Sequence, residues 1–422
     1  MRRVALLALI AIPLMLLTVR RGVAFPPDEK TIPASGTADK RLASFDAMMT
    51  DFLKAHPEIP GAALAVGRDG KLLYSRGYGY ADHDHKHEVK PDSLFRIASV
   101  SKPLTSVAIL QLVEHGKLKL DDRIFEVLGL DVPKDKSVKF DDRWQKVTIH
   151  QVLQHTGGWD RDKSFDPMFV NGDVCKEMKV KSPAGQMDII HYMVRHPLDF
   201  DPGSKYAYSN FGYCMLGRVV EKVSGKKYED YVREEVLKPV GAEESRLGHT
   251  LLDERFANEV WYYAGDKKGN AILGPNVGKP VPWPYGAWNL EVMDSHGGWV
   301  ATAPDLVRFA AAFDNPDKCK LLSAKSIETM FAPPPGDPGH EKGKVKEVYY
   351  GCGWEVRPYG KDKHNTWHTG LLDGTSTILV RRLDGLSWAV LFNASALEKG
   401  GQPAGAIDSL VHKAADAVKE WP

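Results

Sequence analysis

The sequence predicts an α/β fold of the α+β type, with one antiparallel β-sheet assembled from both ends of the chain. Three observations lead to this prediction. Strand patterns occur near the N-terminus and return near the C-terminus, the region between them has mainly helical patterns, and a helical segment stands at each end. We therefore expect helices to flank the sheet and a mainly α-helical domain to be inserted into it.

The N-terminal part of the sheet is expected to be a hairpin. Residues 61–66 and 71–78 read as strands, and Asp69-Gly70 between them supplies the positive φ that a tight turn needs. A helix is expected before the hairpin, over residues 40–55, because apolar residues recur there at helical spacing. A second helix, rich in Leu, Val and Ile, is expected over residues 98–115.

The other strands are expected late in the chain, at residues 350–356, 365–369, 375–381 and 387–392. Residues 404–420 then close the chain as an amphipathic helix. The stretch from about 120 to 300 mixes short helical patterns with loops and lacks convincing alternating strands. We therefore expect one domain over residues 39–422, with its α/β part at about 39–119 and 301–422 and its helical insert at about 120–300.

The first residues predict a secretory signal. Arg2 and Arg3 precede an apolar run, and Gly22-Val23-Ala24 has small residues where a signal peptidase cleaves. We expect a signal peptide at 1–24, a linker at 25–38, and export to the periplasm or the medium. The alternative is an uncleaved N-terminal membrane anchor, although the run is shorter than the ~20 residues that a membrane span needs.

Composition excludes several kinds of partner and cofactor. The 56 basic and 55 acidic residues nearly balance, which argues against nucleic acid as a partner. Four cysteines are too few and too scattered for a disulfide scaffold, and none forms a Cys-x-x-Cys pair. Alternating His83, His85 and His87 would line one face of a strand as metal ligands, but a solvated loop is favoured. We expect no metal and no cofactor.

Ser99-Val100-Ser101-Lys102 stands where the helix of residues 98–115 is expected to begin. Residues i and i+3 share a helical face, so the Lys102 amine can approach the Ser99 hydroxyl. Free backbone N–H groups at a helix start favour a developing oxyanion. Burial by the following apolar residues would lower the pKa of the lysine from its usual ~10.4. Ser224-Gly225-Lys226-Lys227 matches the same pattern, but it lies in a polar turn and is interpreted as a loop.

Tyr208-Ser209-Asn210 supplies two further groups. A phenol beside a lysine ammonium loses its proton more easily and can then act as a base. An asparagine two residues later can hydrogen-bond a substrate amide. The segment follows a Pro-Gly turn, and it contains the only Tyr-x-Asn in the chain.

His368-Thr369-Gly370 ends an expected strand, where a glycine allows a substrate backbone to approach the strand edge. The backbone N–H of Leu371 is a candidate oxyanion donor. His155-Thr156-Gly157 repeats the pattern, but it follows helical spacing and is interpreted as a helix C-terminal cap with a structural role.

Together and in this order, the three elements resemble those of the serine β-lactamase and penicillin-binding protein superfamily, whose motifs are Ser-x-x-Lys, Ser-Asp-Asn and Lys-Thr-Gly. The tyrosine form is similar to the class C branch, which includes AmpC-like enzymes, DD-peptidases, D-aminopeptidases and family VIII-type esterases. The resemblance extends over about residues 38–393.

This resemblance implies a β-lactamase/transpeptidase-like fold with the site at the junction of its two parts. It also implies residue roles. Ser99 would be acylated, Lys102 and Tyr208 would move its proton, and Asn210 would orient the substrate. His368, Thr369 and Gly370 would line the substrate site, with the N–H groups of Ser99 and Leu371 forming the oxyanion hole.

One departure from the family pattern bears on the substrate. Many β-lactamases have a lysine at the position of His368, and that permanent cation can bind the carboxylate of the drug, whereas histidine is mostly neutral at pH 7. We therefore expect a serine hydrolase that forms an acyl-enzyme with a small ester or a D-amino-acid or cell-wall peptide. A true β-lactamase and a non-catalytic binding relative of the fold are the alternatives. The expected partner is a small-molecule or peptide substrate, peptidoglycan included, and the oligomeric state stays open.

Overall fold

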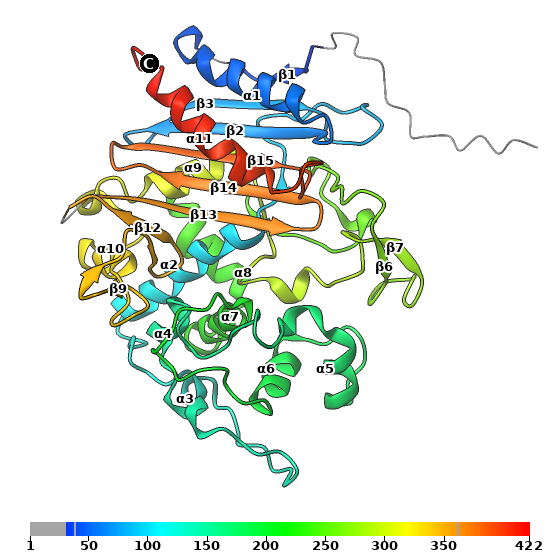
Figure 1. Ribbon diagram of the computed structural model, residues 1–422, viewed down its shortest axis with the longest axis vertical. Coiled ribbons are helices and arrows are strands. Elements are labelled where there is room, and N and C mark those ends of the chain that lie inside the picture. The colour runs from blue at the N-terminus through cyan, green and yellow to red at the C-terminus, as the bar shows by residue number, and fades with distance from the viewer. Residues whose placement is uncertain (1–30, 38, 361–362) are drawn as a thin grey trace, which may run out of the picture. The chain divides into compact units, whose positions relative to one another are not determined.

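The computed structural model describes residues 31–37, 39–360 and 363–422 (Figure 1). The signal peptide predicted at 1–24 lies outside these residues, as does most of the linker predicted at 25–38. None of the helices described combines the length and the apolar character that crossing a membrane requires.

The centre of the fold is an antiparallel sheet of eight strands in the order β1-β3-β2-β15-β14-β13-β12-β11. Its strands are β1 (Ala34–Ser35), β2 (Gly61–Arg68), β3 (Lys71–Gly79), β11 (Tyr349–Tyr350), β12 (Glu355–Pro358), β13 (His364–Leu372), β14 (Thr375–Arg381) and β15 (Leu386–Phe392). Strands from the start of the chain thus lie beside strands from its end, which confirms the predicted sheet.

The pairing of β2 with β15 joins the two ends of the chain. Leu64 pairs with Val390 in the middle of this antiparallel ladder. Asn393, directly after β15, strengthens the junction: its side-chain oxygen accepts from Gly61 N at 2.9 Å, and its amide nitrogen donates to Tyr80 O at 3.2 Å. The buried Asn393 therefore ties the end of β15 to both strands of the N-terminal hairpin.

Helices cover both faces of the sheet. Figure 1 shows α1 (Ala43–Ala55) and α11 (Pro403–Asp416) on one face, as the apolar patterns at the two chain ends predict. On the other face lie α9 (Ala303–Ala311) and then α2 (Ser101–Glu114). Residues 101–112 of α2 are buried all round, because this helix separates the sheet side from the helical part of the molecule.

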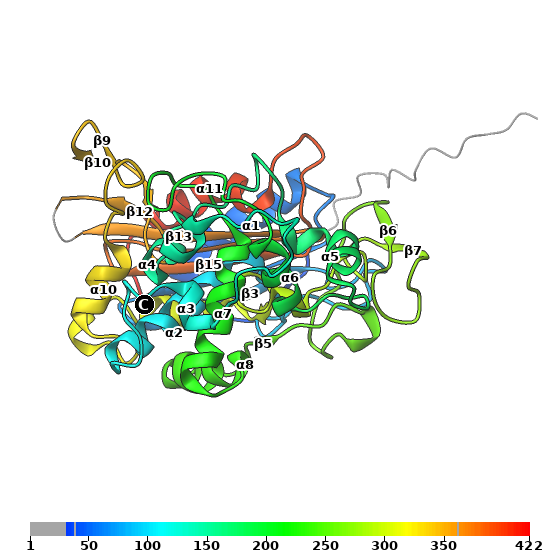
Figure 2. The ribbon, with the colours of Figure 1, turned by 90° about the horizontal axis from the view of Figure 1, so that it is seen from below.

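The predicted helical insert is present between β4 and β8 (Figures 1 and 2). Its helices are α3 (Ile124–Leu128), α4 (Ile149–Leu153), α5 (Asn171–Met178), α6 (Gln186–Val194), α7 (Asn210–Ser224) and α8 (Tyr228–Tyr231). A further helix, α10 (Ala324–Phe331), precedes the late strands.

Several short strands were not predicted. A three-stranded sheet joins β4 (Phe95–Arg96), β8 (Trp299–Ala301) and β5 (Arg246–Leu247), and β6 (Lys268–Asn270) pairs with β7 (Pro280–Pro282). Strand β1 lies in the expected linker, and β9 (His340–Glu341) and β10 (Lys344–Val345) form another small pair. Strands of two or three residues are too short to show an alternating pattern, so sequence periodicity misses them.

Replacing Asn393 tests the junction between the chain ends. We expect Asn393→Ala to lower the free energy of unfolding by about 1–3 kcal/mol, because the buried N–H of Gly61 loses its acceptor. Urea denaturation measures the loss. Asn276→Ala, at an exposed loop position, is the matched control. A change below about 0.5 kcal/mol, which is usual for a surface substitution, would contradict this account of the junction.

Candidate active site

Ser99 lies in a short 3-10 turn, Ala98–Val100, that runs directly into α2. Ala98 has a positive φ of 47°, which is uncommon for a residue other than glycine. The Ser101 hydroxyl donates to Ala98 O at 2.6 Å, and the Thr377 hydroxyl of β14 donates to Ile97 O at 2.9 Å. These bonds hold the turn, and so the Ser99 side chain, against the sheet.

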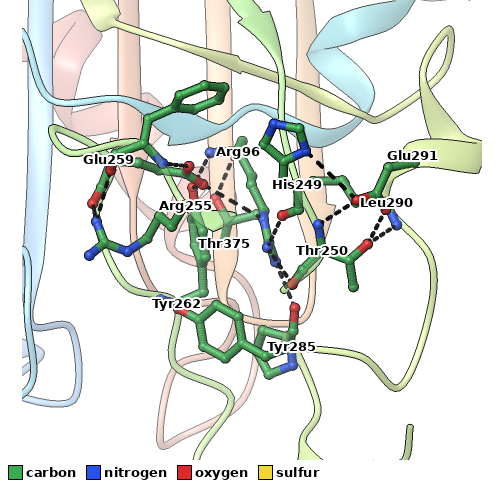
Figure 3. A network of polar contacts seen from close by, with 12 residues as sticks. Arg96, His249, Thr250, Arg255, Glu259, Tyr262, Tyr285, Leu290, Glu291 and Thr375 are labelled. Carbon is green, nitrogen blue, oxygen red and sulfur yellow. Dashed lines mark hydrogen bonds and ion pairs between the residues drawn. The ribbon is translucent and has the colours of Figure 1, made fainter. Parts of the chain in front are cut away.

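A buried network holds the segment that leads to Ser99 (Figure 3). The Arg96 side chain is almost fully buried and donates to the carbonyl oxygens of Pro284 at 2.8 Å and His249 at 2.7 Å. Its guanidinium also lies 4.3 Å from the centroid of the Tyr262 ring and 3.9 Å from the Glu259 carboxylate. Arg96 thus connects the segment that precedes Ser99 to loops of the helical insert.

Lys102 lies one helical turn after Ser99, as predicted, and its side chain is fully buried. Its amine nitrogen lies 3.2 Å from Ser99 Oγ, 2.8 Å from Asn210 Oδ1 and 2.9 Å from His296 O. Burial lowers the pKa of Lys102 well below its ordinary value of 10.5; the nearby Asp166 carboxylate opposes this effect and Arg161 adds to it. This environment favours the neutral amine.

The neighbours of the amine also orient it. A carbonyl oxygen and an amide oxygen can only accept, so His296 O and Asn210 Oδ1 take the two N–H groups of a neutral amine. The lone pair then faces the Ser99 hydroxyl, which can donate. This arrangement directs the lone pair of a neutral Lys102 amine toward Ser99 Oγ.

Asn210 is held in turn by an acid that sequence analysis missed. Its Nδ2 donates to Asp166 Oδ2 at 2.6 Å, which settles the orientation of the amide and leaves Oδ1 for Lys102. Burial raises the pKa of Asp166, and the hydrogen bond from Asn210 opposes that rise. Asp166 precedes a proline and caps a 3-10 turn by accepting from Met168 N, which is an ordinary role for aspartate, so the sequence carried no signal of its contact with Asn210.

Tyr208 lies beside Ser99 and Lys102. The amine of Lys102 is 4.6 Å from the centroid of the Tyr208 ring. The buried His155 ring packs against the Tyr208 ring, with 4.4 Å between the ring centroids. Burial raises the pKa of Tyr208, although hydrogen bonding to Ser99 and the charge of Arg161 act against this. The phenol therefore stays protonated. The expectation that Lys102 would help it to ionise is wrong, because burial destabilises a phenolate and Lys102 itself tends to be neutral.

His368 is buried and neutral. Its Nδ1 lies 2.6 Å from Thr369 O, which can only accept, so Nδ1 carries the proton and Nε2 accepts from the Tyr350 hydroxyl at 2.9 Å. Burial, and then the charge of Lys102, lowers the pKa of His368 to about 3. His368 thus offers a substrate no positive charge.

The end of β13 presents an open edge to the site. Its pairing with β12 stops at Trp367, so residues 368–372 have β14 on one side and no β12 residue on the other. Gly370 allows this strand to approach the Ser99 turn, because a Cβ atom there would lie 2.2 Å from Ile97 O. Leu371, whose N–H was predicted as an oxyanion donor, follows on this edge and is 42% exposed.

One cavity of about 310 Å³ collects these groups. The predicted residues that line it are Ser99, Tyr208, Asn210, His368, Thr369 and Leu371, whereas Lys102 and Gly370 lie behind its wall. Sequence analysis missed other lining residues, among them Arg161, Phe169, Met293, His296, Glu355, Leu372 and Gln402. They come from five separate stretches of chain, which no local pattern connects.

Glu355 is the acidic residue of the cavity wall. It stands at the start of β12 and is partly buried, and burial raises the pKa of its carboxyl to about 7. Among the described residues, none donates a hydrogen bond to this carboxyl at a normal distance. It is therefore an unpaired acid in direct reach of a bound molecule.

The other motifs have structural roles. Ser224 ends α7, and Gly225 caps it with a left-handed φ of 74°. His155 follows α4, and its Nδ1 accepts from Ser209 N at 3.1 Å, which supports the Tyr208 segment. The interpretation of His155 as part of a helix C-terminal cap is confirmed, whereas the loop predicted at Ser224 begins only after it, because Ser224 is the last residue of α7.

The structure brings together one group of possible metal ligands besides the three histidines considered from the sequence. His83, His85 and His87 lie in an exposed loop, as favoured. His249, Glu254 and Glu291 also bring ligand atoms within 4.8 Å of one another. Both carboxylate oxygens of Glu291, however, already accept from Thr250 (Figure 3).

The shifted pKa of Glu355 predicts a pH-dependent stability. The pKa of its carboxyl is about 7 in the folded chain and 4.5 as an ordinary value, so folding favours the protonated form. Its contribution to stability is therefore present below pH 4.5 and is lost as the pH rises toward 7. Relative to the parent, Glu355→Gln should gain about 2 kcal/mol in free energy of unfolding between pH 4.5 and pH 8.

Urea denaturation at the two pH values measures this gain. Glu347→Gln, at an exposed position, is the matched control. A difference between parent and Glu355→Gln that stays constant with pH would show that the carboxyl is not perturbed.

Comparison with known proteins places this geometry in a family. The family model described as Beta-lactamase matches residues 45–412. Penicillin-binding protein 4* of Bacillus subtilis (strain 168) is 28% identical over 77% of this chain and 65% of its own length. Protein flp of Staphylococcus aureus (strain NCTC 8325 / PS 47) is 28% identical over 78% of this chain and 58% of its own length. The chain thus spans about three fifths of the length of these relatives.

Solved structures share the fold. The octameric penicillin-binding protein homologue from Pyrococcus abyssi has a TM-score of 0.65 at 22% identity, covering 90% of this chain and 79% of its own. The D-amino acid amidase from Ochrobactrum anthropi SV3, complexed with L-phenylalanine amide, has a TM-score of 0.65 at 23% identity, covering 90% and 99%. With a family model matching nearly the whole described chain and the three motifs meeting in one cavity, the chain belongs to the Beta-lactamase family.

Proposed function

We propose that this protein is a serine hydrolase that cleaves an ester or amide through an acyl-enzyme on Ser99. One observation carries the proposal: the buried amine of Lys102 lies 3.2 Å from Ser99 Oγ, with both of its N–H groups directed to acceptors that cannot take part in the reaction. A neutral amine in this position is a general base aimed at the serine hydroxyl.

In the proposed reaction, Ser99 Oγ forms a bond to the substrate carbonyl carbon while its proton passes to Lys102 Nζ. The carbonyl π electrons move to the oxygen, which the backbone N–H groups of Ser99 and Leu371 stabilise. As the carbonyl re-forms, the bond to the leaving group breaks, and the leaving group takes the proton of Tyr208. The Lys102 ammonium then restores that proton.

The second half of the reaction returns the enzyme to its starting state. A water molecule gives a proton to Lys102 and adds to the acyl carbon. Collapse of this intermediate releases the carboxylic acid and returns a proton to Ser99. Tyr208 fits its part as a proton donor because burial keeps the phenol protonated. Asn210 then has two roles. Its amide oxygen accepts a hydrogen bond from Lys102, and its position in the cavity wall allows it to orient the substrate.

For the substrate, we propose a small ester or a D-amino-acid or cell-wall peptide, met after export through the leader predicted at 1–24. The names of a penicillin-binding relative and of a D-amino acid amidase with the same fold support this class. A β-lactamase proper is the second candidate, supported by the family itself. The neutral His368 argues against it, because the cation that binds the drug's carboxylate in many β-lactamases is missing at that position.

Replacing the nucleophile tests the acyl-enzyme. We expect the parent to release a burst of nitrophenol from a short-chain nitrophenyl ester and to gain the mass of the acyl group. Ser99→Ala should show neither and should lose at least about 10³-fold in kcat/KM. The chain offers a matched control in Ser224→Ala, the serine of the second Ser-x-x-Lys match, which should behave like the parent.

Intact-protein mass spectrometry with esters, D-amino-acid peptides and β-lactams separates the candidates. Rapid nitrocefin turnover would favour the β-lactamase. A Ser99→Ala variant as active as the parent would refute the mechanism, and a parent that no probe acylates would point to a non-catalytic relative of the fold.

A further inference from the structure

The cavity wall contains a cation whose hydrogen bonds are unused. The Arg161 side chain is 41% exposed and lines the cavity beside Tyr208. The carboxylate oxygens closest to its guanidinium belong to Asp166, at 3.9 Å, and to Asp162, at 4.0 Å. Both distances exceed those of a hydrogen bond. In the described part of the chain, no other group accepts from this guanidinium at hydrogen-bond distance.

Several arginines that stabilise the fold donate to named acceptors. Arg96 donates to backbone carbonyl oxygens, and Arg143 donates to Asp141 and Asp201. Arg218 contacts Asp294 at 2.5 Å. Arg161 differs from these three arginines, because it lines the cavity and has no acceptor at hydrogen-bond distance among the described residues.

Tyr208 holds the guanidinium in place. The central carbon of the guanidinium lies 4.8 Å from the centroid of the Tyr208 ring, a cation–π distance. A cation–π contact needs no hydrogen-bond acceptor, so it leaves the guanidinium N–H groups available to a ligand. A planar fork held in this way is ready to donate two parallel hydrogen bonds to a carboxylate.

The remaining charges of the site leave Arg161 as the cation available to a bound molecule. Lys102 is buried and gives its N–H groups to Asn210 and His296. His368 is neutral, because burial lowers its pKa to about 3. Glu355 lines the same cavity, but burial raises its pKa to about 7, so it carries only a partial negative charge at neutral pH.

We propose that Arg161 binds a carboxylate of the substrate, so that the enzyme selects esters or amides with a carboxylate near the scissile bond. This inference rests on the proposed acyl-transfer function and specifies its substrate class. Thr369 and Gln402 line the same cavity and offer further donors to the anion. Arg161 thereby supplies the positive charge that His368 does not.

Three matched aryl esters test this assignment. The first is uncharged phenyl butyrate, the second has a carboxylate on the leaving group (3-carboxyphenyl butyrate), and the third has it on the acyl group (the monophenyl ester of succinic acid). We expect the parent to have a higher kcat/KM for one of the two charged esters than for the uncharged one. Which of the two is preferred tells whether Arg161 faces the leaving group or the acyl group.

Substitution of Arg161 should remove this preference. We expect Arg161→Gln to lower the ratio of kcat/KM for the preferred charged ester to that for the uncharged ester by about 10- to 100-fold. Arg161→Lys, which keeps the charge and loses the planar fork, should retain part of the preference. Arg233→Gln, at an exposed position outside the cavity, removes the same net charge and should leave the ratio unchanged.

A measurement on the parent alone covers the case in which the variants do not fold. Hippurate should inhibit hydrolysis of the uncharged ester at least about 10-fold more strongly than hippuramide, which has the same shape without the charge. The inference is overturned if the parent prefers neither charged ester and hippurate has no advantage, or if Arg161→Gln keeps the full preference. Since acylation of Ser99 by the uncharged ester is measured separately, these results leave the proposed function standing.

Discussion

The site depends on a single buried amine. Lys102 Nζ contacts Ser99 from the turn before its helix, Asn210 from the start of α7 and His296 from the loop before β8. An amine removed from water must find partners or give up its charge. Here two oxygen atoms accept hydrogen bonds from the amine, which leaves the lone pair of its neutral form for Ser99. The hydrogen bonds of one nitrogen atom thus connect three segments that are distant in the sequence. Burial disfavours the charged ammonium form of this lysine, and it therefore favours the neutral amine, which can act as a base.

The sheet provides the other wall of the site, and it does so through the junction of the chain ends. Pairing of β2 with β15 extends the sheet to β14 and β13, which brings the open edge of β13 against the Ser99 turn. Contact at that point is close: Thr377 bonds to Ile97 O, and only a glycine fits at position 370. Arg96 fixes the same segment from the side of the insert (Figure 3). The Ser99 turn is therefore clamped between the two parts of the fold.

The residues proposed to carry out the reaction differ in charge from those proposed to recognise the substrate. The groups proposed to move protons are buried and tend toward their neutral forms: Lys102 by a lowered pKa and Tyr208 by a raised one. When the resting groups are neutral, the buried site holds separated charges only while the reaction proceeds. Arg161 and Glu355, by contrast, line the cavity without hydrogen-bond partners among the described residues. Their side chains can therefore interact with charged groups of a substrate.

The sequence by itself determined the features that rest on local spacing. It placed Ser99 and Lys102 one helical turn apart, the Asp69-Gly70 hairpin, the last three strands, and the helices at both chain ends. The strand predicted at 350–356 is instead interrupted by a turn between β11 and β12. The three motifs and their order along the chain also indicated the family. Only the tertiary structure decided what depends on contacts between distant segments: the bond from Asn210 to Asp166, the positions of Arg161 and Glu355 in the cavity, and the protonated state of Tyr208. The burial and orientation of these side chains arise only when the segments pack together, so they cannot be predicted from local sequence patterns.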